Sequence, residues 1–200
     1  MERRQYDASE IRVEGEGEPV LVGHAAVFDT LSLEMWGFRE KIAPGAFADT
    51  LGKDDIRALW NHEPGAVLGR VAAGTLELRE DKKGLAVRIK TPDTQIGRDA
   101  VTSIGRGDVS QMSFGFRVLD DEWEPDDEDR STLIRTINSA QLFEVSPVTF
   151  PAYPATDINV RDFDGALESL KRAKDAAKPV LRPRLMAAHR AIVEIMLSNA

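Results

Sequence analysis

Short runs of apolar residues, separated by turn-forming residues, dominate the first 150 positions of the chain. Residues 20–28 are strongly apolar, and residues 56–61 form a second apolar run. Residues 85–90 alternate apolar and polar side chains, which is the period of a half-buried strand. Together with residues 75–80 they flank a turn that ends in Gly84, which we expect in the left-handed conformation of a hairpin. The pattern predicts a mainly β fold.

Two short helices interrupt the predicted strands. Residues 44–51 begin with Pro44, whose fixed φ angle suits the first turn of a helix. Residues 98–104 form the second helical segment, and Gly105 and Gly107 are expected to end it. The predicted fold class is therefore mainly β with flanking helices.

The composition changes after Pro151. Residues 163–177 and 184–198 are rich in alanine, leucine, lysine and glutamate, and the second of these stretches has one apolar face. That face suits packing on its own domain and suits a partner or dimer surface equally well. We predict two parts, a domain over residues 1–161 and a helical extension over residues 162–200.

The overall composition narrows the classes of function. The 200 residues carry a formal net charge of -8, which argues against nucleic acid and anionic membranes as main partners. There is no cysteine, so disulfides, thiolate zinc sites and cysteine nucleophiles are excluded. No apolar run reaches the roughly 18 residues that span a bilayer, and the first residues lack the apolar centre of a signal peptide. We expect a protein that acts in a cytoplasm.

Motifs for metals and nucleotides are absent from the sequence. There is no His-Glu-x-x-His helix, no phosphate-binding loop, no dinucleotide fingerprint and no Gly-x-Ser-x-Gly elbow. The acidic residues 120–129 lack the glycine and the ligand order of a calcium loop, so we interpret them as a solvated hairpin tip. We therefore expect neither a cofactor nor a metal.

Three side chains with catalytic chemistry lie in strand-like apolar runs. His62 follows Leu-Trp-Asn, and Glu144 lies among the apolar residues 142–148. Ser113 lies in a run where Met, Phe and Phe alternate, so Ser113 and Gly115 share the face opposite the core. A base, a hydroxyl and a carboxylate are the parts of a serine hydrolase site. This arrangement predicts a nucleophile over an open cleft, with Gly115 leaving room for a substrate backbone.

Each of these residues also has an ordinary structural explanation. His62 suits a hydrogen-bonded turn, and Ser113 suits the solvent face of an amphipathic strand. Glu144 suits an ion pair with an arginine, because an unpaired buried charge is costly. Only the three side chains taken together favour catalysis.

Six segments, taken in order, resemble the caudovirus prohead proteases, which are the capsid-maturation serine proteases of tailed phages. The likeness covers residues 8–161. The segments are residues 23–28 (GHAAVF), 40–47 (EKIAPGAF), 59–62 (LWNH), 67–70 (VLGR), 112–116 (MSFGF) and 144–152 (EVSPVTFPA).

The resemblance implies a fold similar to the herpesvirus assemblin protease, a strand barrel surrounded by short helices. It implies that Ser113 is the nucleophile and His62 the base. In the assemblin relatives the third member of the triad is a second histidine. Here Glu144 occupies the matching place after the nucleophile, whereas His24 precedes both other residues and stands where the family tends to carry tyrosine. Glu144 is our choice for the third member, with His24 as the alternative.

The function implied by the resemblance is that of a serine endopeptidase in prohead maturation. Its partners would be the capsid precursor, whose scaffolding part it cleaves, and the protease itself, inside assembling proheads in the host cytoplasm. Assemblin relatives pair through helices, so the apolar face within residues 185–196 predicts a homodimer. Two alternatives remain, a non-enzymatic internal scaffold or assembly protein of the prohead and a peptide-binding module.

Overall fold

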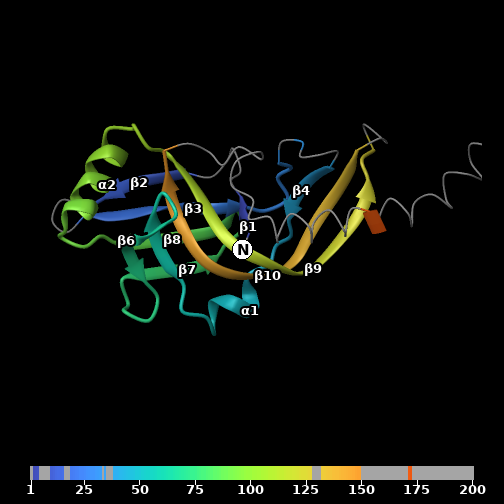
Figure 1. The fold of residues 1–200 in the computed structure, drawn as a ribbon, viewed down its shortest axis with the longest axis horizontal. Coiled ribbons are helices and arrows are strands. Elements are labelled where there is room, and N and C mark those ends of the chain that lie inside the picture. Colours follow the sequence, from blue (N-terminus) through green and yellow to red (C-terminus); the bar gives the residue numbers. More distant parts are fainter. Residues whose placement is uncertain are drawn as a thin grey trace, which may run out of the picture. The chain divides into compact units, whose positions relative to one another are not determined.

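The computed structural model describes residues 2–4, 10–15, 19–32, 34, 38–127, 132–149 and 171–172. Ten strands and two helices lie within these residues (Figure 1). They are β1 (Glu2–Arg4), β2 (Glu10–Glu14), β3 (Val20–Val27), β4 (Phe38–Ile42), α1 (Ala48–Leu51), β5 (Arg57–Trp60), β6 (Glu63–Arg70), β7 (Leu76–Glu80), β8 (Gly84–Lys90), α2 (Gln95–Gly105), β9 (Gln111–Pro125) and β10 (Leu133–Val148).

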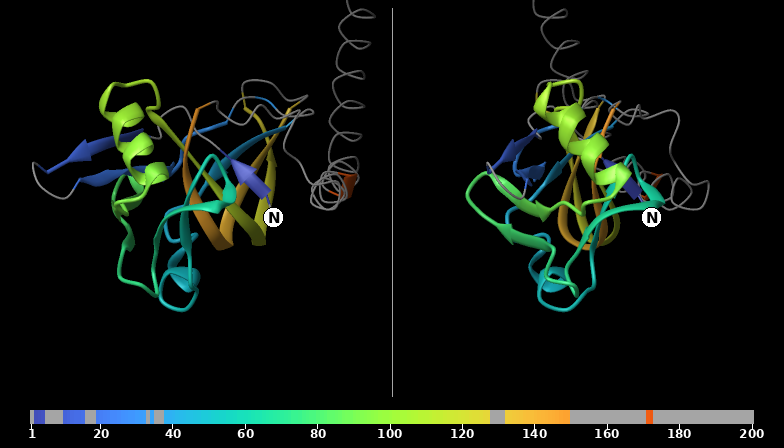
Figure 2. Two further views of the ribbon diagram at one scale, coloured as in Figure 1. Left: turned by 60° about the vertical axis from the view of Figure 1, so that its left-hand side comes forward. Right: turned by 90° about the vertical axis from the view of Figure 1, so that its left-hand side faces the viewer.

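The strands form two sheets, and the long β9–β10 hairpin is the centre of the first (Figure 1). This sheet has six strands in the order β1-β9-β10-β5-β6, and β4 also pairs with β10. β9 and β10 are antiparallel, whereas β4 and β5 each run parallel to a different part of β10. The second sheet is antiparallel throughout, with the order β2-β3-β8-β7. Helix α2 packs beside β2 and β6 (Figure 2).

The predicted fold class is confirmed in its general form, because the described chain is mainly β with two short helices. The predicted strand barrel is not closed among the described strands. Among the described strands, no pairing closes either sheet on itself or joins one sheet to the other.

The apolar residues of both sheets meet in one core. Phe114 and Phe116 of β9 are fully buried, with ring centroids 5.0 Å apart, and Phe47, in the turn before α1, packs edge-on against Phe114 at 5.8 Å. Leu21 and Ile89 of the second sheet belong to the same cluster. The predicted core face of β9 is therefore confirmed, as its alternation of apolar residues requires.

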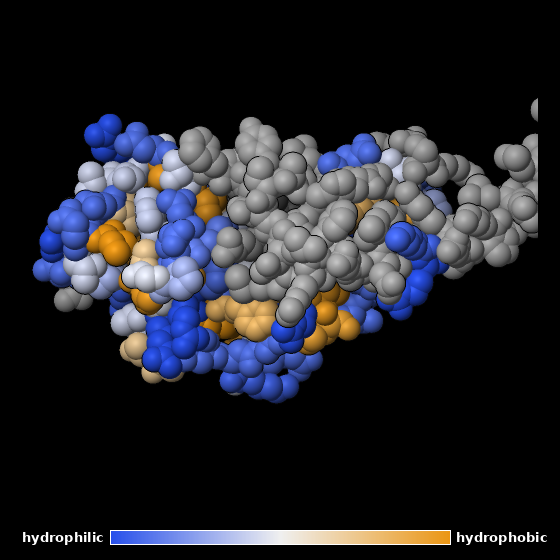
Figure 3. All heavy atoms as spheres, in the orientation of Figure 1, coloured by the Kyte–Doolittle hydropathy of each residue, from blue (hydrophilic) through white to orange (hydrophobic). Residues whose placement is uncertain are grey.

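Few large apolar side chains are left outside this core. Among the described residues, those with substantial exposure are Val67, Ile96 and Leu119. Figure 3 shows apolar side chains at the surface in small groups among hydrophilic ones. Burial of apolar area is the main favourable contribution to folding here, as in other globular domains.

The predicted hairpin forms as β7 and β8, but the expected conformation of Gly84 is wrong. The positive φ angles of the described glycines fall at other positions. The Asp81 side chain holds the turn instead, accepting bonds from the backbone N–H groups of Lys83 (2.8 Å) and Gly84 (3.1 Å). Glycine is needed at 84 because a Cβ there would lie 2.0 Å from the carbonyl oxygen of Ala26 on β3.

The helix predictions are right in place and wrong in extent. Helix α1 is shorter than predicted, since residues 44–47 form a turn ahead of it. Helix α2 begins earlier than predicted, because the Thr94 side chain caps it by accepting a bond from the N–H of Gly97 at 3.2 Å. Gly105 lies within the helix, and Gly107 follows it with φ +81°.

The acidic stretch also differs from its prediction. β9 continues to Pro125 and pairs with β10 throughout, so residues 120–125 are strand rather than tip. Within this part, Asp121 accepts a bond from Arg135 at 2.5 Å, and Arg135 also donates to Glu40 at 3.1 Å. The predicted helices over residues 163–177 and 184–198 lie outside the described residues, apart from helical Lys171 and Arg172.

Candidate active site

His62 lies in a two-residue turn between β5 and β6. Trp60 pairs with Glu63, so Asn61 and His62 alone connect the two strands. Their φ angles are +49° and +61°, as a type I′ turn requires. Asparagine and histidine enter this left-handed region more often than most residues, but the conformation is still strained, at a typical cost of about 1–3 kcal/mol for a non-glycine residue. The turn therefore needs support from outside the hairpin.

The end of β10 provides this support. The Asn61 side chain donates to Thr149 Oγ1 at 3.1 Å and accepts a bond from the Thr149 backbone N–H at 2.8 Å. The Asn61 backbone N–H donates to the carbonyl of Pro147 at 3.1 Å, and that of His62 donates to Ser146 Oγ at 3.3 Å. These four bonds hold the strained histidine beside the last residues of β10.

The imidazole of His62 forms a buried pair with Glu144 on β10. Its Nδ1 lies 2.7 Å from Glu144 Oε1, and both side chains are more than nine-tenths buried. An ionised carboxylate only accepts hydrogen bonds, so Nδ1 carries the proton. The other ring nitrogen, Nε2, is buried and has no hydrogen-bond partner among the described residues. The geometry therefore leaves a proton acceptor at Nε2.

The second oxygen of the Glu144 carboxylate is also held. Ser146 lies two residues further along β10, hence on the same face of the strand, and its hydroxyl donates to Oε2 at 2.5 Å. Sequence reasoning missed Ser146, Asn61 and Thr149. The spacing of two between Glu144 and Ser146 was the available signal, and the Asn-His pair was the signal for the turn.

Ser113 lies on the strand next to this pair. In the β9–β10 register, Ser113 is directly opposite Ser146, and Gly115 is directly opposite Glu144. Directly opposed residues project to the same face of a sheet with Cβ atoms about 4.5–5.5 Å apart. The structure thus brings all three predicted residues to one region of the six-stranded sheet, with β10 between β9 and the turn that carries His62.

The expected open cleft is not observed in this conformation. Ser113 is fully buried, and residues 112–116 are buried on both faces of the strand. One reason is that the Asn61–His62 turn bonds to Ser146, directly opposite Ser113, and so adds cover on that face. Because Nε2 has no partner among the described residues, the Ser113 hydroxyl does not donate to it here. The role of Gly115 beside a substrate stays a prediction.

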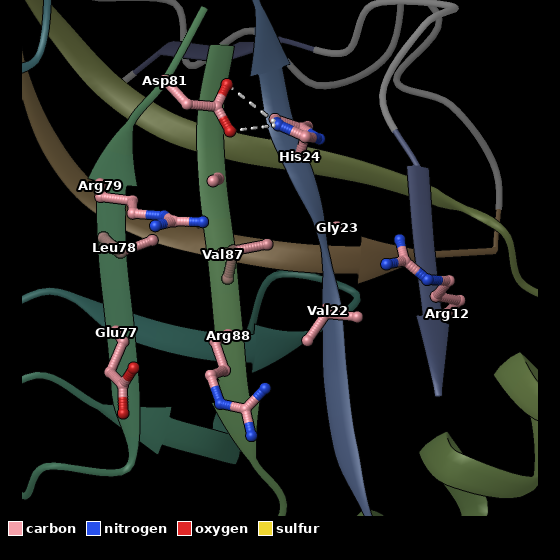
Figure 4. A pocket seen from close by; sticks show the side chains of 11 residues that line it. Arg12, Val22, Gly23, His24, Glu77, Leu78, Arg79, Asp81, Val87 and Arg88 are labelled. Atoms are coloured by element: carbon pink, nitrogen blue, oxygen red, sulfur yellow. Dashed lines mark hydrogen bonds and ion pairs between the residues drawn. The ribbon is translucent and has the colours of Figure 1, made fainter. Parts of the chain in front are cut away.

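His24, the alternative third residue, lies in the other sheet. Its Nε2 is 3.0 and 3.2 Å from the two carboxylate oxygens of Asp81, and it lines a pocket with Arg12 and Arg88 (Figure 4). Burial raises the pKa of Asp81, but hydrogen bonds from His24 and from two backbone N–H groups outweigh this, so that pKa is lowered overall. His24 and Glu144 therefore belong to separate hydrogen-bonded pairs.

In the described part of the chain, no group of three or more His, Asp or Glu side chains is placed to hold a metal ion. No described helix has the length and apolar character needed to cross a membrane.

An imidazole that bonds to a buried carboxylate beside a serine-bearing strand is the arrangement of a serine hydrolase. The sequence profile of the caudovirus prohead serine protease family matches residues 5–170, so this chain belongs to that family. Comparisons with curated proteins and with solved structures find no match. The predicted family and the predicted role as a serine protease of prohead maturation are confirmed. Membership also implies action on prohead or capsid precursor proteins inside proheads.

Proposed function

We propose that this protease works through Ser113 as nucleophile, His62 as general base and Glu144 as the acid that orients the base. We further propose that it cleaves the scaffolding part of capsid precursors and itself. The observation that carries the proposal is the buried pair of His62 and Glu144, which leaves Nε2 without a partner on the side of the sheet where Ser113 lies.

The reaction follows from the hydrogen-bond roles of these groups. Ser113 Oγ attacks the scissile carbonyl carbon and transfers its proton to Nε2 of His62. Glu144 stabilises the imidazolium through Nδ1–H and holds the ring in the required tautomer. Nε2–H then protonates the leaving amine, and the peptide bond breaks to leave an acyl-enzyme. A water molecule, deprotonated by Nε2, then attacks the acyl carbon. The ester bond to Ser113 Oγ breaks, Nε2–H returns its proton to Oγ, and the acid product leaves.

The described conformation is a resting state in this proposal. Ser113 is fully buried and does not bond to Nε2, so a local opening and a rotation of its side chain must precede the attack. Catalytic hydrogen bonds are often formed only when substrate binds. The backbone of Ser113 and the backbone of His62 are each already bonded to β10. The required movement is therefore confined to side chains and to the residues that cover Ser113.

Two structural expectations accompany the proposal. We propose the assemblin-like barrel implied by the resemblance as the architecture to which the two described sheets belong. The homodimer through residues 185–196 stays a prediction as well. Sedimentation over a wide concentration range tests the dimer, and a monomer mass that does not change with concentration would contradict it.

The decisive experiment compares two serine variants. Ser113→Ala removes the nucleophile, whereas Ser110→Ala removes an exposed serine just ahead of the same strand. We expect wild type and Ser110→Ala to cleave themselves and the scaffold polypeptide, and to react with a fluorophosphonate probe. Ser113→Ala should lose about 10³-fold or more in rate and should not be labelled.

The remaining outcomes separate the alternatives. Equal cleavage by wild type and Ser113→Ala would refute the assigned nucleophile. Absence of labelling and cleavage in every form would favour a non-enzymatic scaffold or assembly protein. Binding of scaffold peptides without turnover would favour a peptide-binding module.

A further inference from the structure

We propose that Ser146 is a positioning residue of the active site, which fixes the Glu144 carboxylate and the backbone of His62 at the same time. This inference rests on the proposed function, because it assigns Ser146 a role in the work of His62 and Glu144. Ser146 itself touches neither the scissile bond nor the attacking oxygen in this scheme.

The hydrogen bonds of Ser146 have only one possible direction each. The Glu144 carboxylate can only accept, and the His62 backbone N–H can only donate. The Ser146 hydroxyl therefore donates its proton to Glu144 Oε2 at 2.5 Å and accepts from His62 N–H at 3.3 Å. The first is the length of a charge-assisted O–H···O⁻ bond, one of the stronger classes in proteins. Ser146 is fully buried, so water does not replace these bonds.

The three residues form a closed ring of hydrogen bonds. His62 N–H donates to Ser146, Ser146 donates to Glu144, and Glu144 accepts from Nδ1–H of His62. With both carboxylate oxygens anchored, Glu144 presents Oε1 to the imidazole in one orientation. The ring of bonds thereby connects His62 to Glu144 through the His62 backbone as well as its side chain. It keeps the proton on Nδ1, so that Nε2 remains the proton acceptor.

Ser146 also supports the strained turn. The His62 N–H lies in a residue with a φ angle of +61°, and such conformations persist where the surroundings determine them. Because Ser146 is directly opposite Ser113 in the sheet, the same backbone position sets the distance from nucleophile to base. A displacement of the imidazole by about 1 Å at this point is enough to slow proton transfer strongly.

The test compares Ser146→Ala with Thr50→Val. Thr50 is a matched control, since its buried hydroxyl also accepts a backbone N–H bond, from Leu142 at 3.1 Å, and donates to a carboxylate, Asp54 at 2.8 Å. Both variants lose one buried hydroxyl that accepts a backbone N–H bond and donates to a carboxylate, and the Thr50 hydroxyl also lies 3.5 Å from the carbonyl of Leu142. Steady-state cleavage of a scaffold peptide and the rate of fluorophosphonate labelling are measured, together with thermal unfolding.

We expect Ser146→Ala to lower kcat about 10- to 100-fold, as when another orienting partner of a functional histidine is removed, with KM unchanged within about twofold. The labelling rate should fall by a similar factor, since a small probe makes little use of substrate-binding contacts. Ser146→Thr, which keeps the hydroxyl, should recover most of the rate. Thr50→Val should lose stability and keep kcat.

The Nδ1–H proton offers a spectroscopic signature. A proton held between a histidine and a carboxylate resonates far downfield in an NMR spectrum, and Ser146→Ala should broaden or remove this signal. Thr50→Val should keep it. If Ser146→Ala does not fold, Ser146→Cys takes its place, because a thiol of similar size is only a weak donor and acceptor. Ser146→Cys should fold and show a reduced kcat.

Failure of this inference is distinct from failure of the proposed function. Wild-type kcat and labelling in Ser146→Ala, or in its cysteine substitute, with Ser113→Ala inactive, would overturn the positioning role and leave the triad intact. An equal loss in Ser146→Ala and Thr50→Val would also overturn it, since the loss would then follow stability alone. An active Ser113→Ala would overturn the proposed function itself.

Discussion

Two histidine–carboxylate pairs occur in the described part of this protein, and their chemistry is similar while their surroundings differ. His62 bonds to Glu144 at 2.7 Å, and His24 bonds to Asp81 at 3.0 Å. In each pair the other ring nitrogen is buried without a hydrogen-bond partner among the described residues. A histidine bonded to a carboxylate is therefore insufficient to define an active site in this molecule.

The surroundings separate the two pairs. Glu144 is buried and has Ser146 on its second oxygen and Ser113 on the adjacent strand. Asp81 is about one-third exposed and lies in the turn that follows β7. Besides His24, two backbone N–H groups donate hydrogen bonds to its carboxylate. The residues that line the pocket beside His24 include no serine or threonine (Figure 4). A serine on the same face, the proposed nucleophile Ser113, is what distinguishes the first pair.

The backbone differs as well. His62 lies in a left-handed turn fixed by β10, whereas His24 lies within β3 and follows the ordinary alternation of a strand up to an irregularity after it. Strained conformations concentrate at functional sites, and only the first pair shows one. The comparison predicts that equivalent substitutions in the two pairs will have unequal effects.

The largest difference is expected between His62→Gln and His24→Gln. Glutamine keeps polar volume but accepts no proton at neutral pH, so His62→Gln should reduce kcat/KM about 10³-fold or more. His24→Gln should change it by less than about twofold. Cleavage of a scaffold peptide by both purified variants measures this, and equal losses would show that the second pair belongs to the active site.

The second largest difference is expected between substitutions of the two carboxylates, Glu144→Gln and Asp81→Asn. Glu144→Gln presents an amide to Nδ1 and disturbs the tautomer, so kcat should fall about 10²- to 10⁴-fold with little change in KM. Asp81→Asn should leave kcat within about twofold. Steady-state kinetics on both variants at the same pH checks this. A Glu144→Gln enzyme with wild-type kcat would remove Glu144 from the triad.

The turn that carries His62 should show a smaller effect, in stability as well as in rate. Asn61→Ala loses two side-chain bonds to Thr149 and a residue that tolerates positive φ, so the free energy of unfolding should fall by about 1–2 kcal/mol. Asn61→Gly keeps the conformation and should lose less. Chemical denaturation of both measures the difference, and a glycine variant less stable than the alanine variant would argue against the strained turn.

The smallest effect concerns the acid stability of the second pair. The pKa of Asp81 is raised by burial but lowered more by its hydrogen bonds, so it lies below the ordinary 3.8. A lowered pKa in the folded state stabilises the fold above the unfolded pKa, and this contribution is lost as the pH falls through the folded value. Asp81→Asn should cost a few tenths of a kcal/mol at neutral pH, because solvent screens the pair.

In Asp81→Asn, the free energy of unfolding should fall less steeply with decreasing pH than in wild type below about pH 4, where wild-type Asp81 takes up its proton. Urea unfolding at a series of pH values from neutral to acid compares the two proteins. Curves that stay parallel down to the lowest pH would mean that the Asp81 bonds do not contribute to folding.

Local pattern was enough to predict much of the fold. The alternation in residues 85–90 and 112–116 identified strands and their buried faces, because side chains in a strand project to opposite sides in turn. Element ends were less predictable. Thr94 as a helix cap is visible in the sequence, but the turn ahead of α1 and the length of β9 depend on pairing with β10.

The candidate site was predictable in its parts and unpredictable in its geometry. His62, Ser113 and Glu144 were named from chemistry and family likeness. Ser146 was missed because its spacing of two from Glu144 places both side chains on one face of the strand but does not show that they bond. Its bond to the His62 backbone depends on a packing arrangement that joins residues 84 positions apart in the chain. The burial of Ser113 also depends on what folds over it.

Sequence alone therefore determined the β character, the apolar core and the three candidate catalytic side chains. Only the tertiary structure decided which histidine joins which carboxylate, and that a second serine closes the ring around the first pair. The physical reason is the distance along the chain over which each effect operates. Periodic patterns and turn preferences depend on a few neighbouring residues. Hydrogen bonds between buried side chains form only where distant strands come into register, and that register is a property of the whole packed sheet.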